Sequence, residues 1–198
     1  MRHLLLSSLA ALAWLGVFSL PLTFAAPNPD QSDKPNFSGI WALDLTASTS
    51  LDALMTQIGA GFFDRKYAAW TKLKATLEQT DDILKVAARG PGFAFDQILY
   101  LDGRNDVSNL QLLGATSVNA KTTWSRDYKQ LLETHHIRTK QGQDGQLIIK
   151  RYLLDEGKTL VVAYTLKLAA ESDETSARQI WRKQTSQVSD HQLTKYWI

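Results

Sequence analysis

The sequence predicts a mostly β protein, a closed antiparallel up-and-down β-barrel of about ten strands with a helix-turn-helix inserted after strand one. Two observations carry this prediction. From about Lys72 onwards, apolar and polar residues alternate with a period of two, which is typical of half-buried strands. Turn-forming residues interrupt the alternation at short, regular intervals, as they do when successive strands pair in an antiparallel sheet.

The composition is that of one globular domain. The chain has 198 residues, of which 44% are hydrophobic and 21% charged, and it contains no cysteine. A chain without cysteine has no disulfide framework and no thiolate metal site. The formal net charge is +2, and no run of Lys or Arg forms a basic patch, so we expect no nucleic-acid partner.

Residues 1–25 are predicted to be a signal peptide. Arg2 and His3 precede a long apolar run, and the small side chains of Thr23 and Ala25 precede a polar stretch. Cleavage near Ala25 predicts a periplasmic or secreted protein. The alternative is an uncleaved membrane anchor, because the apolar run is nearly long enough to span a bilayer.

The chain after Ala25 divides into a lead-in, a barrel and a tail. Residues 26–36 are rich in Pro, Asn, Asp and Ser, which predicts a flexible lead-in. The barrel is expected over residues 37–184, with its first strand over 37–45. Residues 185–198 are expected to form a polar C-terminal tail.

Two short helices are predicted directly after the first strand. The first has an apolar stripe at helical spacing, made of Leu51, Leu54, Met55 and Ile58. The second has an aromatic-rich stripe, made of Phe62, Phe63, Tyr67, Trp70 and Leu73. Gly59 and Gly61 separate the two stripes, which predicts a helical hairpin.

The remaining strands follow one another with short turns between them. They are predicted over residues 73–79, 83–89, 95–101, 109–113, 119–126, 130–139, 146–155, 159–168 and 177–183.

Three stretches of the chain occur in a characteristic order and spacing. The first strand carries Phe37, Gly39, Trp41 and Leu43, and the helical hairpin reads LDALMTQIGAGFFDRK over residues 51–66. Residues 148–153 read IIKRYL and are followed, after a turn, by VVAY over 161–164. Together they resemble the fatty-acid-binding and cellular retinoid-binding proteins of the calycin group, which have lipocalin-like barrels. The resemblance implies a lipid-sized cavity inside the barrel.

Arg151 is the first candidate for contact with a ligand. It shares one face of its strand with Leu147 and Ile149, so an inward orientation would place a cation in an apolar chamber. Its guanidinium either anchors a ligand carboxylate, as the resemblance implies, or forms an internal salt bridge with Glu133. His135 lies two residues from Glu133 and joins the same candidate site.

Further candidates lie on the last strands and on the helical hairpin. Gln179 and Trp181 stand where the fatty-acid binders carry Arg-x-Tyr, and they resemble the retinol-binding branch instead. They either contact the ligand head group or line the barrel, and the same alternatives apply to Tyr164. Phe62 and Met55 are expected at the cavity entrance, as the resemblance implies, or they dock the helices on the barrel rim.

No catalytic or metal-binding pattern emerges. His135 and His136 are adjacent, so on a strand they point to opposite faces and cannot share one metal ion. The sequence lacks a G-x-S-x-G motif, and the glycines flanking Pro91 are not followed by the lysine of a phosphate-binding loop. We expect no enzymatic activity and no cofactor.

These observations predict an exported, monomeric carrier of a hydrophobic small molecule, such as a fatty acid or related lipid, without stable membrane insertion. The alternative is an interaction or inhibitor module on the same barrel, with no physiological lipid ligand. An outer-membrane barrel is a third class. It is disfavoured because the strands are short, at about 6–8 residues, and because charged residues occupy the predicted outer faces.

Overall fold

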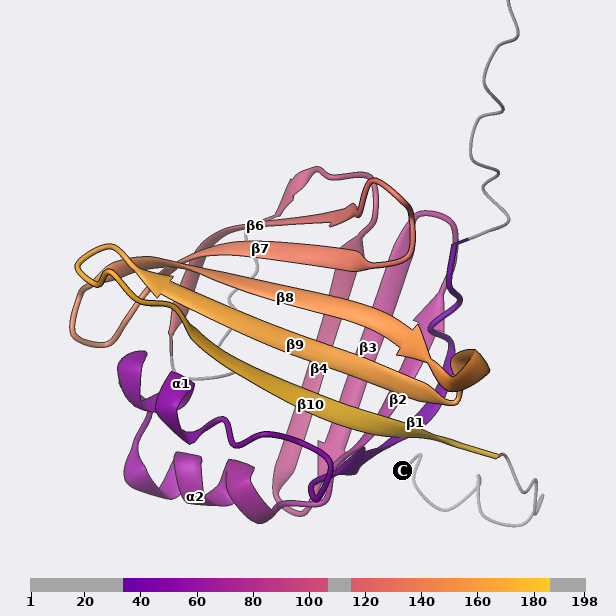
Figure 1. The fold of residues 1–198 in the computed structure, drawn as a ribbon, viewed down its shortest axis with the longest axis horizontal. Helices are drawn as coiled ribbons and strands as arrows, with labels where there is room; N and C mark the ends of the chain where they lie inside the picture. Colours follow the sequence, from indigo (N-terminus) through magenta and orange to yellow (C-terminus); the bar gives the residue numbers. More distant parts are fainter. Residues whose placement is uncertain (1–33, 107–114, 186–198) are drawn as a thin grey trace, which may run out of the picture. The chain divides into compact units, whose positions relative to one another are not determined.

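The computed structural model describes residues 34–106 and 115–185 and contains one ten-stranded antiparallel sheet in the order β4-β3-β2-β1-β10-β9-β8-β7-β6-β5 (Figure 1). The elements, in chain order, are β1 (Gly39–Asp44), α1 (Asp52–Gln57), α2 (Phe62–Trp70), β2 (Lys74–Gln79), β3 (Ile83–Gly90), β4 (Phe93–Tyr100), β5 (Asn105–Asp106), β6 (Thr116–Trp124), β7 (Leu131–Arg138), β8 (Asp144–Leu154), the 3-10 helix η2 (Asp155–Gly157), β9 (Thr159–Leu168) and β10 (Thr175–Gln184).

The predicted fold class is confirmed. Apart from β4 and β5, strands that follow one another in the chain pair with each other, and β1 also pairs with β10, which joins the first and last strands of the meander. Within the described ranges no ladder connects β4 with β5, so the barrel is nearly closed. The strand predicted over 109–113 lies outside the described residues, as do the signal peptide and residues 186–198 of the tail.

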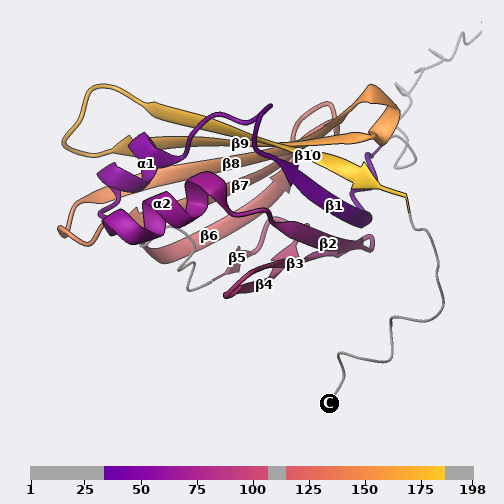
Figure 2. The same cartoon turned by 90° about the horizontal axis from the view of Figure 1, so that it is seen from below.

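The helical hairpin covers one end of the barrel (Figure 2). The amide of Lys140, in the β7–β8 turn, donates to the carbonyl of Ile58 directly after α1 at 3.3 Å. Gly59 then has a φ of +85°, and a Cβ at this position would lie 2.6 Å from the Gln141 side chain. Only glycine satisfies both constraints, so Gly59 ends α1 and brings the hairpin close to the barrel wall.

The structure corrects one expectation for the second helix. Leu54, Met55 and Ile58 are buried as the stripe of α1 predicts, but α2 has no buried residue. Phe63 is 84% exposed and Trp70 is 73% exposed. The inner side of α2, with Tyr67 and Ala68, borders a cavity, whereas Phe63 and Trp70 face away from the barrel.

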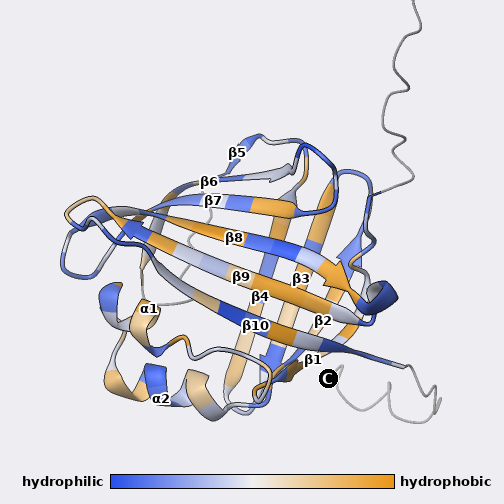
Figure 3. Ribbon diagram, viewed as in Figure 1, coloured by the Kyte–Doolittle hydropathy of each residue, from blue (hydrophilic) through white to orange (hydrophobic). Residues whose placement is uncertain are grey.

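The opposite end of the barrel is filled by side chains. The ring of Phe37 stacks on Trp124 with 6.0 Å between centroids, and Trp41 Nε1 donates to the Phe37 carbonyl at 3.0 Å. In Figure 3 hydrophobic residues colour much of β8 and β9, and the middle of β8, where Lys150 and Arg151 lie, is hydrophilic. These contacts close the end of the barrel opposite the helices.

No helix in the described part of the chain combines the length and apolarity needed to cross a bilayer.

Candidate functional site

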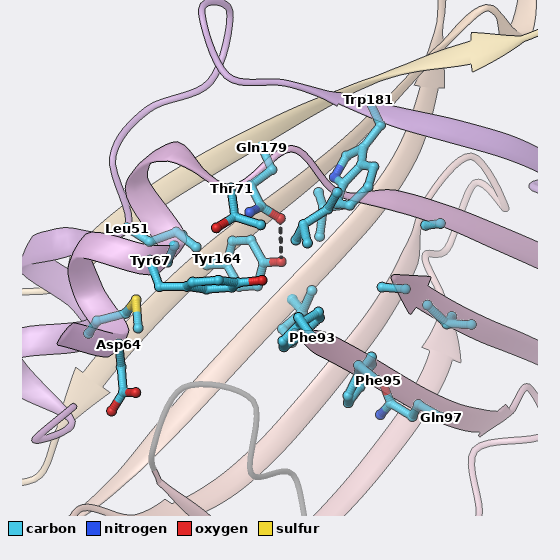
Figure 4. Close-up of a pocket in the computed structure, with 18 of the residues that line it drawn as sticks. Leu51, Asp64, Tyr67, Thr71, Phe93, Phe95, Gln97, Tyr164, Gln179 and Trp181 are labelled. Atoms are coloured by element: carbon cyan, nitrogen blue, oxygen red, sulfur yellow. Dashed lines mark hydrogen bonds between the residues drawn. The ribbon is translucent and has the colours of Figure 1, made fainter. Parts of the chain in front are cut away.

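A cavity of about 560 Å³ lies inside the helix-covered end of the barrel. Its lining comes from both helices and from the inward faces of strands on both sides of the barrel (Figure 4). Apolar side chains predominate, and a few polar groups project among them. This volume and composition are typical of sites that enclose a small organic molecule.

The register of β8, β9 and β10 brings three polar side chains together on the cavity wall. Arg151 lies opposite Val162, and Val162 lies opposite Gln179. Tyr164 is the diagonal neighbour of Gln179, and its hydroxyl donates to Gln179 Oε1 at 2.9 Å (Figure 4). Trp181 follows two residues later on the same face, because side chains alternate along a strand.

Arg151 forms an ion pair with Glu133, and both side chains are buried. Glu133 lies opposite Ile149 on β8, so Arg151 is its diagonal cross-strand neighbour. Of the two interpretations drawn from the sequence, the structure therefore shows the internal salt bridge.

Two further side chains contact the Glu133 carboxylate. Gln97 Nε2 donates to Oε2 at 3.5 Å from β4, and His135 Nε2 lies 3.4 Å from the same oxygen. Ser117 Oγ lies 3.4 Å from His135 Nδ1. With Nε2 protonated, the imidazole donates to Glu133 and accepts from the serine hydroxyl. These contacts hold the carboxylate in place across the barrel interior.

Burial shifts the pKa values of two side chains on the cavity wall, Arg151 and Tyr164. Desolvation lowers the pKa of Arg151 to about 10, although its electrostatic interaction with Tyr164 acts to raise this pKa. Arg151 nevertheless remains a cation at neutral pH, as its partner Glu133 requires. Desolvation raises the pKa of Tyr164, and the charge of Arg151 acts to lower it. Tyr164 therefore stays a neutral hydroxyl donor.

No protein-family model and no curated protein sequence matches the chain, but several solved structures do. The apo crystal structure of Caenorhabditis elegans lipid binding protein 8 superposes with a TM-score of 0.55 at 13% identity, covering 75% of this chain and 95% of that protein. Echinococcus granulosus fatty-acid-binding protein 1 gives 0.53 at 15% identity, with 75% and 98% covered. A Schistosoma mansoni fatty acid binding protein in complex with arachidonic acid gives 0.52 at 15% identity, with 75% and 96% covered.

The chain has the fatty-acid-binding-protein fold. This confirms, at the level of the fold, the resemblance that the sequence shows in the first strand, in the helical hairpin and in residues 148–164 of β8 and β9. At 13–15% identity the likeness extends to the fold alone. The ligand must therefore be argued from the residues of this cavity.

Within this fatty-acid-binding-protein fold, the residues predicted from the sequence lie in three places. Those that line the cavity are Met55, Arg151, Tyr164, Gln179 and Trp181. Glu133 and His135 are fully buried and are not part of the lining, because Arg151 and Gln97 stand between Glu133 and the open volume. Phe62 is 57% exposed and does not line the cavity.

Several lining residues escaped the sequence analysis. Phe93, Phe95 and Gln97 project from alternate positions of β4, and Tyr67 projects from α2 (Figure 4). Alternation along β4 was the signal that could have identified Phe95 and Gln97. In the described residues no cluster of His, Cys, Asp or Glu is arranged to hold a metal ion.

Proposed function

We propose that the protein is an exported, non-catalytic carrier that encloses a hydrophobic small molecule, a fatty acid or related lipid, in its barrel. The observation that carries this proposal is the largely apolar cavity of about 560 Å³ under the helical hairpin. Folding ordinarily fills the interior of a barrel with side chains, so an open apolar volume of this size favours a bound ligand.

The neighbours in structure support a lipid-sized ligand. One of them is a lipid binding protein, and another is a fatty acid binding protein in complex with arachidonic acid. The fold of this chain places its cavity in the same kind of barrel, and the lining beside Ala75 and Ala88 leaves room for a hydrocarbon chain.

The buried polar groups support a role without catalysis. Ser117, His135 and Glu133 form a chain of contacts, but all three are buried away from the cavity lining. A catalytic nucleophile and its base must reach the reacting atom of a substrate. The contacts of these residues favour a structural role instead.

Filling the cavity is expected to abolish binding without unfolding the protein. Ala88 points into the cavity from β3, so Ala88→Phe places a ring where the ligand would lie. We expect the affinity for the uncharged lipophilic dye Nile red to fall at least tenfold, about 1.4 kcal/mol. Fluorescence titration measures this loss, and native mass spectrometry of freshly purified protein shows whether a lipid is already bound.

The neighbouring residue provides the matched control. Ala87 lies on the same strand but on the outer face, so Ala87→Phe should leave dye binding unchanged. Equal binding by wild type and Ala88→Phe would contradict a ligand inside the barrel.

One observation favours the alternative, an interaction or inhibitor module. Phe62, Phe63 and Trp70 expose apolar surface together on α2. Exposed apolar patches of this kind often mark sites of association. If the protein bound neither Nile red nor any co-purified lipid, the result would favour this alternative, with the exposed apolar patch on α2 as the site of association.

Export is the part of the proposal that rests on residues 1–25. If the signal peptide is cleaved, the protein recovered from the periplasm or medium of its native host should begin at Ala26 when its intact mass is measured. Recovery of the uncleaved chain from the cytosolic fraction would contradict export.

A further inference from the structure

The charges that face the cavity restrict the head group it can hold. Three charged side chains are part of the described lining. Asp64 and Lys140 are exposed, one on α2 and the other in the β7–β8 turn against α1. Arg151 is buried, and it is already ion-paired with Glu133. The interior therefore has no uncompensated cation for a carboxylate.

A carboxylate placed in this interior would be poorly matched. A buried charge is unfavourable unless an opposite charge and hydrogen bonds compensate for it. A fatty-acid head group that reached Arg151 would meet a guanidinium whose charge is already compensated by Glu133, which also accepts from Gln97. Two carboxylates beside one guanidinium would leave an uncompensated negative charge inside the barrel.

One hydrogen-bond donor on the cavity wall has no partner. Trp181 is 6% exposed, and its indole Nε1 makes no hydrogen bond with any residue in the described part of the chain. Its ring lies beside Gln179 on the wall of the cavity (Figure 4). Buried donors are nearly always paired, so an unpaired one on a ligand cavity indicates an acceptor supplied by the ligand.

The groups next to Trp181 complete a neutral polar site. Tyr164 donates its hydroxyl hydrogen to Gln179 Oε1, which leaves the amide hydrogens of Gln179 and a lone pair of the Tyr164 oxygen for another partner. A hydroxyl group can accept from Trp181 and Gln179 and donate in return. A carboxylate can only accept.

We propose that the ligand is a long-chain lipid with an uncharged, hydroxyl-bearing head group, and that Trp181 Nε1 donates a hydrogen bond to its oxygen. This inference deepens the proposed carrier function and rests on it. Trp181 thereby holds the oxygen of the alcohol, while the Arg151–Glu133 pair leaves no net positive charge to compensate a carboxylate.

Matched ligands on the full-length protein test this selection. Hexadecan-1-ol and hexadecanoate, which have the same chain length, are compared by displacement of Nile red at a pH where the acid is ionised. We expect the alcohol to bind at least about tenfold more tightly than the carboxylate. In Trp181→Phe, which keeps an aromatic ring but removes the N–H, alcohol affinity should fall about three- to tenfold.

Two controls separate a head-group effect from a folding effect. Because Nε1 has no hydrogen bond to lose, Trp181→Phe should still fold cooperatively, with its melting temperature lowered only by the smaller ring. Trp70→Phe, at an exposed position on α2, should leave both affinities unchanged.

The possible outcomes are distinct. Tighter binding of the carboxylate would overturn the inference and leave the carrier function standing. If Lys140→Gln then removed that tighter binding, the carboxylate head group would lie at the mouth of the cavity, next to Lys140. An alcohol affinity that is unchanged in Trp181→Phe would overturn the role of Trp181. Failure of Nile red and of both lipids to bind would instead contradict the carrier function itself.

Discussion

Arg151→Gln is expected to lower the free energy of unfolding by about 3–5 kcal/mol. The substitution removes the cation that compensates Glu133, whose side chain is fully buried. Gln97 and His135 still contact the carboxylate, but neither carries a positive charge at neutral pH. Chemical denaturation of the variant and the wild type measures the difference.

A double-mutant cycle shows whether the pair acts as a unit. Glu133→Gln alone should destabilise the protein by a similar amount, because it leaves the guanidinium of Arg151 unpaired. The double variant Arg151→Gln/Glu133→Gln should recover most of the loss, since no buried charge remains. Additive losses would contradict the internal pair.

An exposed ion pair provides the matched control for this cycle. Arg138 Nε lies 2.8 Å from Asp144 Oδ1, and both side chains are more than half exposed. Arg138→Gln should change stability by no more than about 1 kcal/mol. The contrast isolates burial as the cause of the larger effect.

Lowering the pH from about 6.5 to about 4 is expected to destabilise the protein through His135. Burial lowers the pKa of His135 from 6.5 to about 4 in the folded state, and the charge of Asp106 opposes this shift. Between these values the unfolded chain binds a proton that the folded protein excludes. The contribution is therefore fully present above pH 6.5 and is lost towards pH 4, by about 3 kcal/mol in total.

The slope of stability against pH tests this expectation. His135→Gln should flatten the curve between pH 4 and 6.5, even though it also alters the contacts with Ser117 and Glu133. His136→Gln, on the exposed face of the same strand, serves as the control and should leave the curve unchanged. An unchanged slope in His135→Gln would assign the acid sensitivity to other groups.

The strands were the most predictable part of the fold. Alternation along β9 predicted its bounds, Thr159–Leu168, to the residue, because one face of that strand is buried along its whole length. The bounds of β4 were less clear: the structure begins the strand at Phe93, two residues before the predicted start. Its inward side chains border open volume and are only partly buried, so the contrast between its faces is weak.

Periodicity was less informative for α2. Its aromatic residues have helical spacing and do form a helix, yet the stripe faces largely away from the barrel. Spacing reveals which residues share a face. It does not reveal whether a neighbouring element is present to bury that face.

The sequence alone determined that Arg151 shares a strand face with Ile149, and that Glu133 shares one with His135; the structure shows that both faces point inward. Whether the two charged groups meet was a matter of tertiary structure. Their contact depends on the register of β7 against β8, in which Glu133 lies opposite Ile149 and Arg151 is its diagonal neighbour. The turn and the cross-strand hydrogen bonds set that register, and a slip of one residue would turn one partner to the outer face. The free donor of Trp181 was likewise decided in three dimensions, because only the folded barrel shows which polar atoms have no partner.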